Sequence, residues 1–309
     1  MIPVNDVQQI HVFSLSHAII IVASQLSAFS FWSSLGVSIL EYRSLGGARV
    51  PIIGMGTFRS FDVSSETDIE SRRKIIANCV ETGVTFIDSS PMYGRSEQVI
   101  GRTAMGQQAN LQFATKVWTR GRRQGEAQIE QSFELMKADH IDVFQIHNLL
   151  DWQTHLETLE RLKDEGRISV IGITHYTTSA LPEMMRIMRS RRIGSVQVPY
   201  NVGDLASTEE MLPLAEELGI GVIVMEPLGQ GRFLRQLRRQ PSVEPLKEFG
   251  LNTWAQALLA WVVSDRRVSV AIPATSRPER IIENAQAGDA GHLTQDVRDY
   301  IREETMRCL

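Results

Sequence analysis

Four side chains that can transfer protons stand in three short stretches of the first half of the chain. Asp88 and Tyr93 lie in FIDSSPMYGRSE, Lys116 lies in FATKVW, and His147 lies in IDVFQIHN. Side chains of these four types act as general acids and bases in enzymes. A charged group inside an apolar strand pattern is costly unless it is paired, so we expect Asp88 and Lys116 to meet. The alternative is a purely structural ion pair, which leaves the nearby Tyr and His unexplained.

The elements that position these residues are apolar runs that alternate with helical patterns from about residue 41 onward. Near-continuous apolar runs are typical of strands buried on both faces of a parallel sheet. A helical pattern, such as Glu66–Glu81 or Thr154–Glu165, follows each strand. The predicted strands are Val50–Gly56, Thr85–Ser89, Phe113–Trp118, Ile141–His147, Ile168–Thr174, Ser195–Tyr200, Gly221–Glu226 and Ser269–Pro273.

Eight strand–helix units predict an α/β fold, the (β/α)8 TIM barrel, over residues 41–309. The alternative, a doubly wound Rossmann sheet, needs a glycine-rich turn between its first strand and first helix. The nearest match begins at Gly54, lacks the third glycine, and runs into Ser60–Ser65 rather than a helix. In a barrel, catalytic residues lie at the C-terminal ends of the strands. The proton-transferring residues would therefore meet at one mouth.

Residues 1–40 differ from the rest of the chain. No Asp, Glu, Lys or Arg occurs from Val7 to Leu40, and the segment is rich in serine and apolar residues. A secretory signal normally opens with basic residues, but the first basic residue is Arg43. A membrane helix needs about 20 largely apolar residues, and here Gln25 and several serines interrupt the run. We predict an extension outside the fold, with a membrane anchor through residues 10–40 or an atypical export signal as alternatives.

The overall composition excludes several classes of protein. The chain has 309 residues, 43% of them hydrophobic, and a net charge of −4, so no basic field argues for nucleic-acid binding. Its two cysteines, Cys79 and Cys308, form no CxxC motif and have no metal-binding spacing, which suits a reducing compartment and predicts a cytoplasmic protein. A metal-dependent hydrolase would need several His and carboxylate ligands at the strand ends. Lys116 accompanies Asp88 and His147 instead, so we predict no metal site.

From about Tyr42 to its end, the chain resembles the aldo-keto reductases of bacterial type, which have a short C-terminal loop. The resemblance rests on the four residues above, on Gln197 in VQVPYN and on IPATSRPERIIEN at 272–284. It implies an NAD(P)H-dependent oxidoreductase that reduces aldehydes or ketones to alcohols. Tyr93 would be the general acid, Lys116 would lower its pKa, and Asp88 would hold Lys116 in place. His147 would orient the substrate carbonyl.

The resemblance also implies a cofactor groove along the later strand ends. Thr174 and His175 stand where the family has Ser-Asn, and Met225 stands where it often has an aromatic residue that stacks on the nicotinamide. The glycines of LGQG, residues 228–231, would let the backbone approach a pyrophosphate; the alternative is that this segment is a solvated surface loop. The cofactor-binding residues implied are Thr174, His175, Gln197, Met225, Pro227, Leu228, Gly231, Pro273, Thr275, Arg277, Arg280, Glu283 and Asn284.

The cofactor implied is NADPH, with NADH as the alternative. Family members often bind the 2′-phosphate with a Lys-Ser pair and a downstream Arg; here Ala274 replaces the Lys, while Arg277 and Arg280 remain. Glu283 and Asn284 would contact the adenine. Five side chains near the strand ends could line a substrate pocket: Phe58, Trp118, Leu149, Trp152 and Tyr176.

The expected partner is a small carbonyl compound, and the chain is expected to be a monomer or a small homo-oligomer. Because the chain ends at Leu309, soon after the last predicted helix, the pocket is expected to be open and to suit small aldehydes or ketones. A second function remains open at this point. The same barrel serves in potassium-channel β subunits as a cofactor-binding regulatory subunit with little turnover.

Overall fold

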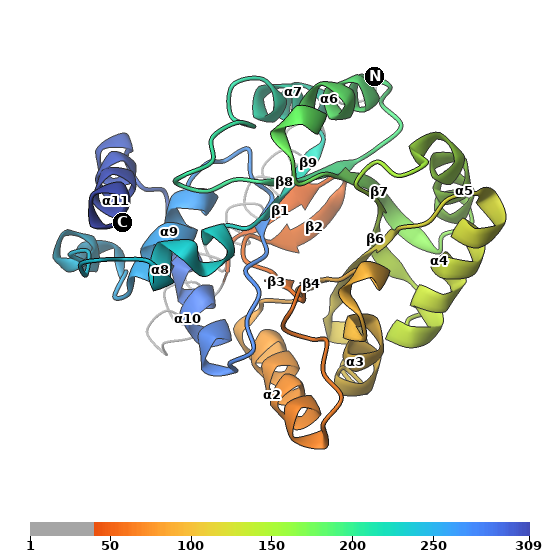
Figure 1. Ribbon diagram of the computed structural model, residues 1–309, viewed down its shortest axis with the longest axis horizontal. Helices are drawn as coiled ribbons and strands as arrows, with labels where there is room; N and C mark the ends of the chain where they lie inside the picture. Colours follow the sequence, from red (N-terminus) through yellow and green to blue (C-terminus); the bar gives the residue numbers. More distant parts are fainter. Residues whose placement is uncertain (1–39) are drawn as a thin grey trace, which may run out of the picture. The chain divides into compact units, whose positions relative to one another are not determined.

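The computed structural model describes residues 40–309, which form a (β/α)8 barrel (Figure 1). The predictions for the N-terminal extension lie outside these residues, apart from Leu40. Leu40 is buried, with 3% of its surface exposed, and packs in the same core as Ile52 and Ile53. The core of the barrel therefore begins at Leu40, the last residue of the predicted extension.

The barrel sheet contains eight parallel strands in the order of the chain. The strands are β3 (Met55–Gly56), β4 (Phe86–Asp88), β5 (Gln112–Val117), β6 (Ile141–His147), β7 (Ile168–Thr174), β8 (Ser195–Pro199), β9 (Gly221–Met225) and β10 (Val270–Ala271). Backbone hydrogen bonds join the last strand to the first, because Gly54 N donates to Ala271 O at 2.9 Å and Ala271 N donates to Ile52 O at 2.9 Å. These bonds close the barrel.

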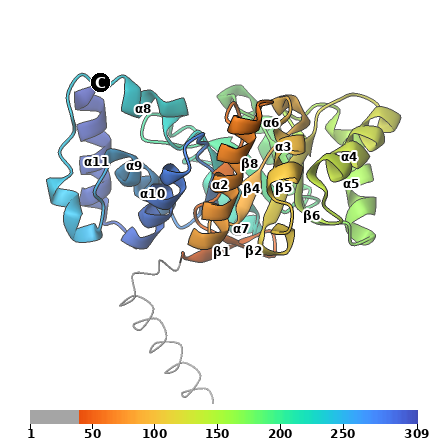
Figure 2. The same cartoon turned by 90° about the horizontal axis from the view of Figure 1, so that it is seen from below.

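The first predicted strand, Val50–Gly56, is wrong as a single element. Its beginning belongs to an antiparallel hairpin of β1 (Tyr42–Leu45) and β2 (Ala48–Pro51), and only β3 joins the barrel. Leu45 and Val50 of the hairpin pack against Phe86 and other residues inside the barrel. The hairpin thus closes the end opposite to α8 (Figure 2).

Helices surround the barrel, as the periodic apolar residues predict. They are α2 (Glu66–Thr82), α3 (Ser96–Thr103), α4 (Arg122–Met136), α5 (Trp152–Asp164), α6 (Leu181–Arg189), α7 (Met211–Leu218), α8 (Arg232–Arg235), α9 (Trp254–Val263), α10 (Glu279–Ala287) and α11 (Gln295–Cys308). Helix α9 is buried along its whole length, and Thr253 and Gln256 form a capping box at its start. Within residues 40–309, no helix is both long and apolar enough to span a membrane.

Candidate active site

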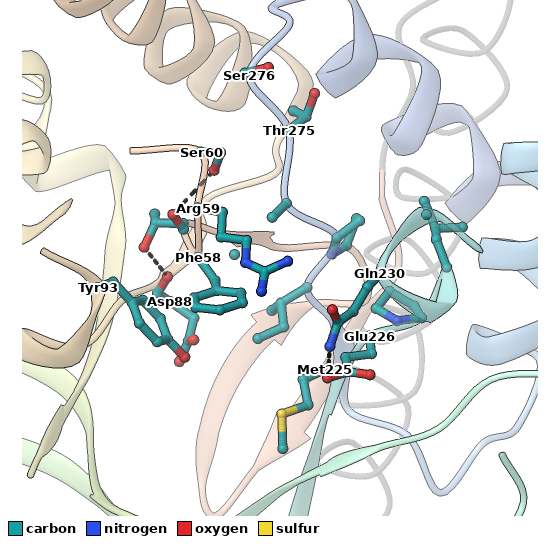
Figure 3. A pocket seen from close by; sticks show the side chains of 18 of the residues that line it. Phe58, Arg59, Ser60, Asp88, Tyr93, Met225, Glu226, Gln230, Thr275 and Ser276 are labelled. Carbon is teal, nitrogen blue, oxygen red and sulfur yellow. Dashed lines mark hydrogen bonds between the residues drawn. The ribbon is translucent and has the colours of Figure 1, made fainter. Parts of the chain in front are cut away.

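A cavity of about 990 Å³ opens at the C-terminal ends of the strands. Residues at or near the C-terminal end of each of the eight strands line it, which is where barrel folds in general place a site. Figure 3 shows Asp88, Tyr93 and Phe58 on one side of this cavity and Glu226 with Gln230 on the other. The strand ends predicted to carry chemistry therefore converge on a single space.

Asp88 and Lys116 form the predicted ion pair beneath the cavity. Lys116 Nζ donates to Asp88 Oδ1 at 2.8 Å and Oδ2 at 2.7 Å, and also to the Ser89 carbonyl oxygen at 2.7 Å. The Gln145 amide, in register with Lys116 on the next strand, donates to Asp88 Oδ1 at 3.0 Å. Burial raises the pKa of Asp88 and lowers that of Lys116, and the partner opposes the shift in both cases.

Tyr93 stands on a short 3₁₀ turn, Pro91–Tyr93, directly after β4. Its ring centroid lies 5.3 Å from Lys116 Nζ and 5.0 Å from the Phe58 ring centroid. Burial raises the pKa of Tyr93 well above its usual value, and the charges of Asp88 and Glu226 add to the effect. The lowering expected from Lys116 does not prevail, because burial dominates this pKa and the Asp88 carboxylate beside the ammonium raises it. Tyr93 is a protonated phenol.

His147, at the end of β6, lies edge-on to Tyr93, with the two ring centroids 5.9 Å apart. Its Nδ1 is 2.9 Å from Ser90 Oγ. Burial, with smaller contributions from Lys116 and His175, lowers the pKa of His147 to about 3. The ring is therefore neutral near pH 7 and can act as a hydrogen-bond donor rather than as a cation.

Most of the residues predicted to hold the cofactor line the same cavity. These are Thr174, Gln197, Met225, Pro227, Leu228, Gly231, Pro273, Thr275, Arg277, Arg280 and Asn284. Gln197 is 1% exposed, and its Oε1 has no hydrogen-bond partner among the described residues. A buried amide oxygen without a partner is costly. A carboxamide N–H in the cavity could satisfy it, so this residue fits a nicotinamide.

Two of the predicted cofactor residues, His175 and Glu283, are absent from the cavity wall. His175 Nδ1 accepts from the Thr177 N–H at 3.1 Å, and the ring stacks on Tyr176 with centroids 5.4 Å apart. Glu283 pairs with Arg280 and accepts from Thr253 Oγ1 at 2.6 Å. Local hydrogen bonds thus direct both side chains away from the cavity.

The predicted substrate residues divide in a similar way. Phe58, Trp118 and Tyr176 line the cavity and are partly exposed to solvent. Leu149 and Trp152 do not line it and pack instead against the hydrophobic core. The Trp152 indole N–H also donates to Glu183 Oε1 at 3.1 Å. Three of the five side chains predicted to line the substrate pocket therefore line the cavity, and all three are aromatic.

Several polar residues that line the cavity were not predicted, among them Arg59 and Glu226. Arg59 follows β3, adopts a positive φ of 60°, and lies over the Phe58 ring at 4.9 Å from its centroid. Glu226 follows β9, has a φ of 54°, and accepts from Gln230 Nε2 at 2.8 Å. The positive φ of both residues is a signal that only the coordinates reveal. Within residues 40–309, no cluster of His, Cys, Asp and Glu could hold a metal ion.

Comparison with known proteins places this geometry in a family. The model of the Aldo/keto reductase family matches residues 52–304. Methylglyoxal reductase YeaE of Escherichia coli is 26% identical over 249 residues, which cover 78% of this chain and 86% of that protein. L-glyceraldehyde 3-phosphate reductase of E. coli is 25% identical over 305 residues, which cover 80% of this chain and 87% of that protein.

Solved structures show the same fold. An aldo/keto reductase from Klebsiella pneumoniae, in complex with NADP and acetate, has a TM-score of 0.73 and 24% identity, and the match covers 86% of this chain and 95% of that one. The holo form of aldo-keto reductase AKR11C1 from Bacillus halodurans has a TM-score of 0.69 and 25% identity, over 86% of this chain and 96% of that one. This chain therefore belongs to the aldo/keto reductase family and is an oxidoreductase of carbonyl compounds.

Proposed function

We propose that this protein reduces small aldehydes or ketones to alcohols, with NADPH as the preferred cofactor and Tyr93 as the general acid. The observation that carries the proposal is the meeting of Tyr93 and His147 in one cavity, directly above the buried pair of Asp88 and Lys116. A structural ion pair alone does not account for a protonated phenol and a neutral imidazole beside it.

Each side chain has a role that follows from its surroundings. The cofactor, when bound, supplies the hydride that reaches the carbonyl carbon. Tyr93 Oη gives its proton to the carbonyl oxygen, which leaves a phenolate that water later reprotonates. The Lys116 ammonium, whose Nζ lies 5.3 Å from the Tyr93 ring centroid, stabilises that negative charge, and Asp88 holds the ammonium in position. His147 hydrogen bonds to the carbonyl oxygen and orients it.

The cofactor groove is proposed to run from Gln197 towards the loop after β10. The unpartnered Oε1 of Gln197 would accept from the carboxamide, and Thr174 beside it offers a hydroxyl. Gly229 and Gly231 have φ angles of 54° and 80°, values at which a side chain is strained, so the loop after β9 can present bare backbone to a pyrophosphate.

The preference for NADPH rests on two arginines at the far end of the cavity. Arg277 and Arg280 both line it and are exposed. Arg280 is paired with Glu283, whereas Arg277 has no ion pair in the described part of the chain. We propose that Arg277 is the main partner of the 2′-phosphate and that Arg280 assists, because guanidinium groups bind phosphate through charge-assisted hydrogen bonds.

The substrate class is proposed from the walls of the cavity. Phe58, Trp118 and Tyr176 present exposed aromatic surface to the cavity, and Phe58 packs on Tyr93, so an apolar or aromatic group next to the carbonyl would be covered. The names of two relatives, a methylglyoxal reductase and an L-glyceraldehyde 3-phosphate reductase, support small aldehydes.

The test is the consumption of NADPH or NADH, followed by absorbance, with a panel of aliphatic, aromatic and α-dicarbonyl compounds. We expect turnover of at least one small aldehyde, and faster turnover with NADPH than with NADH. Tight binding of cofactor without turnover of any carbonyl compound would favour the regulatory-subunit alternative. The Tyr93→Phe variant serves as the control for reaction at this site.

A further inference from the structure

Ser90 lies between the general acid and the histidine and contacts both elements. Its hydroxyl is fully buried, at the start of the turn that carries Tyr93. Ser90 Oγ accepts from the Met92 N–H at 3.2 Å and lies 2.9 Å from His147 Nδ1. One serine thus caps the Tyr93 turn and also binds the His147 ring.

The position of the hydroxyl hydrogen follows from counting donors and acceptors. A serine hydroxyl has one hydrogen to donate and two lone pairs that accept. One lone pair is taken by Met92. If His147 Nδ1 carried a hydrogen, Ser90 Oγ would accept twice and its own buried hydrogen would have no acceptor among the described residues. Leaving a buried donor unpaired is more costly than the opposite arrangement, in which Ser90 donates to Nδ1.

We propose that Ser90 is a positioning residue that fixes His147 in the tautomer with a bare Nδ1 and a hydrogen on Nε2. No described residue forms a hydrogen bond with His147 Nε2, and His147 lines the cavity. The Nε2–H and the Tyr93 hydroxyl are then two donors that face the same cavity. Together they can hold one carbonyl oxygen as negative charge develops on it, which is the arrangement of an oxyanion hole.

This inference rests on the proposed role of His147 in carbonyl reduction, and the choice of tautomer matters because the ring is neutral. A neutral imidazole has one donor and one acceptor nitrogen. In the other tautomer, the lone pair of Nε2 would face the carbonyl oxygen and repel it. The Ser90 hydroxyl therefore determines whether His147 attracts or repels the substrate oxygen.

Two variants, whose new side chains have the same size and shape as each other, separate the proposed control of the His147 tautomer from the capping of the Tyr93 turn. In Ser90→Asn, the side-chain oxygen can still cap the turn and the amide N–H can still donate to Nδ1. In Ser90→Asp, the carboxylate can cap the turn, since Asp and Asn are both favoured at this position. The carboxylate only accepts, however, so it would draw a hydrogen onto Nδ1. A simple capping role predicts equal activity for the two variants.

We expect Ser90→Asp to have a kcat/KM for the carbonyl substrate at least about tenfold below that of Ser90→Asn, since general acid–base and orienting groups are worth ~10²–10⁴-fold. The control is Ser269→Ala at the opposite end of the barrel. Ser269 Oγ is also buried, accepts from the Val222 N–H at 3.1 Å and donates to Ser44 O at 2.7 Å. Its removal therefore breaks one accepted and one donated hydrogen bond, the same two kinds that Ser90 makes. The control should leave kcat/KM unchanged.

The deciding measurement is ¹⁵N NMR of the histidine side chains in the wild-type protein, with His147→Gln to assign its signals. We expect His147 to show a protonated Nε2 and an unprotonated Nδ1 at neutral pH. A protonated Nδ1, or equal activity of the Asn and Asp variants, would overturn the proposal. The spectrum does not depend on turnover, so it decides the tautomer even if no carbonyl compound is reduced or if a Ser90 variant fails to fold.

Discussion

Lys116 directs its ammonium at Asp88, with both carboxylate oxygens within 2.8 Å, in a pair that is almost completely removed from solvent. Two buried charges are tolerated here because each is the other's main partner, and because Gln145 and the Ser89 carbonyl complete their hydrogen bonds. The pair is therefore part of the folded core, and its ammonium lies 5.3 Å from the Tyr93 ring centroid.

Breaking this pair should cost stability as well as activity. We expect Lys116→Met to lower the free energy of unfolding by ~3–5 kcal/mol, because it leaves the Asp88 carboxylate buried without its cation. Chemical denaturation followed by circular dichroism measures the change. Removing an exposed pair, for example by Arg192→Met opposite Glu160, should cost less than about 1 kcal/mol. Equal losses in the two variants would contradict this account.

The shifted pKa values of His147 and Tyr93 predict a flat pH profile. His147, with a pKa of about 3, stays neutral as the pH falls through 6.5, its ordinary value. Tyr93, with a raised pKa, keeps its proton as the pH rises towards its ordinary value of 10.0. We therefore expect kcat/KM for the carbonyl compound to change less than about threefold between about pH 6 and pH 9. A steep fall with a midpoint near the ordinary pKa of histidine would be inconsistent with a neutral, buried His147.

Cofactor preference tests the two arginines of the groove. One charge-assisted hydrogen bond is worth ~1.5–3 kcal/mol, so Arg277→Ala should raise the Kd for NADPH about tenfold or more. The Kd for NADH should change little, because NADH lacks the 2′-phosphate. Quenching of tryptophan fluorescence can report both values, since Trp118 lines the cavity. Arg266→Ala, on the opposite side of the barrel, is the control. Equal wild-type affinities for the two cofactors would end the NADPH assignment but not the reductase assignment.

The boundary of the barrel predicts where the chain can be shortened. A chain that begins at Leu40 should fold and keep full activity, because all eight barrel strands and the closing hairpin lie after this residue. A chain that begins at Glu41 loses the buried Leu40 side chain and should be less stable by ~1.5–3 kcal/mol. Thermal unfolding of the two shortened chains measures the difference. If the chain that begins at Leu40 fails to fold, the barrel needs residues 1–39 for folding.

The sequence predicted the barrel and the position of its main site because both depend on patterns along the chain. Apolar runs marked the strands, and Asp88, Lys116 and His147 stood at their ends, where neighbouring strands bring side chains together. The first barrel strand was misplaced because β2 and β3 form one apolar stretch, and only pairing partners reveal that the chain turns between them.

The direction of individual side chains could not be predicted in the same way. His175 directly follows Thr174, the last residue of β7, yet a hydrogen bond from Thr177 and stacking on Tyr176 hold its ring outside the cavity. Arg59 lines the cavity and has a positive φ. The sequence gives no signal of a positive φ at a residue other than glycine. The direction of the Tyr93 pKa shift depended on burial and on the nearby carboxylates of Asp88 and Glu226, and the extent of burial cannot be read from spacing.

The most direct test of the central claim is Tyr93→Phe, which removes one hydroxyl and keeps the ring that packs on Phe58. If Tyr93 is the general acid, kcat for carbonyl reduction should fall by ~10²–10⁴-fold, while the Kd for NADPH and the melting temperature stay close to their wild-type values. Turnover at the wild-type rate in a protein that binds NADPH normally would contradict the assignment.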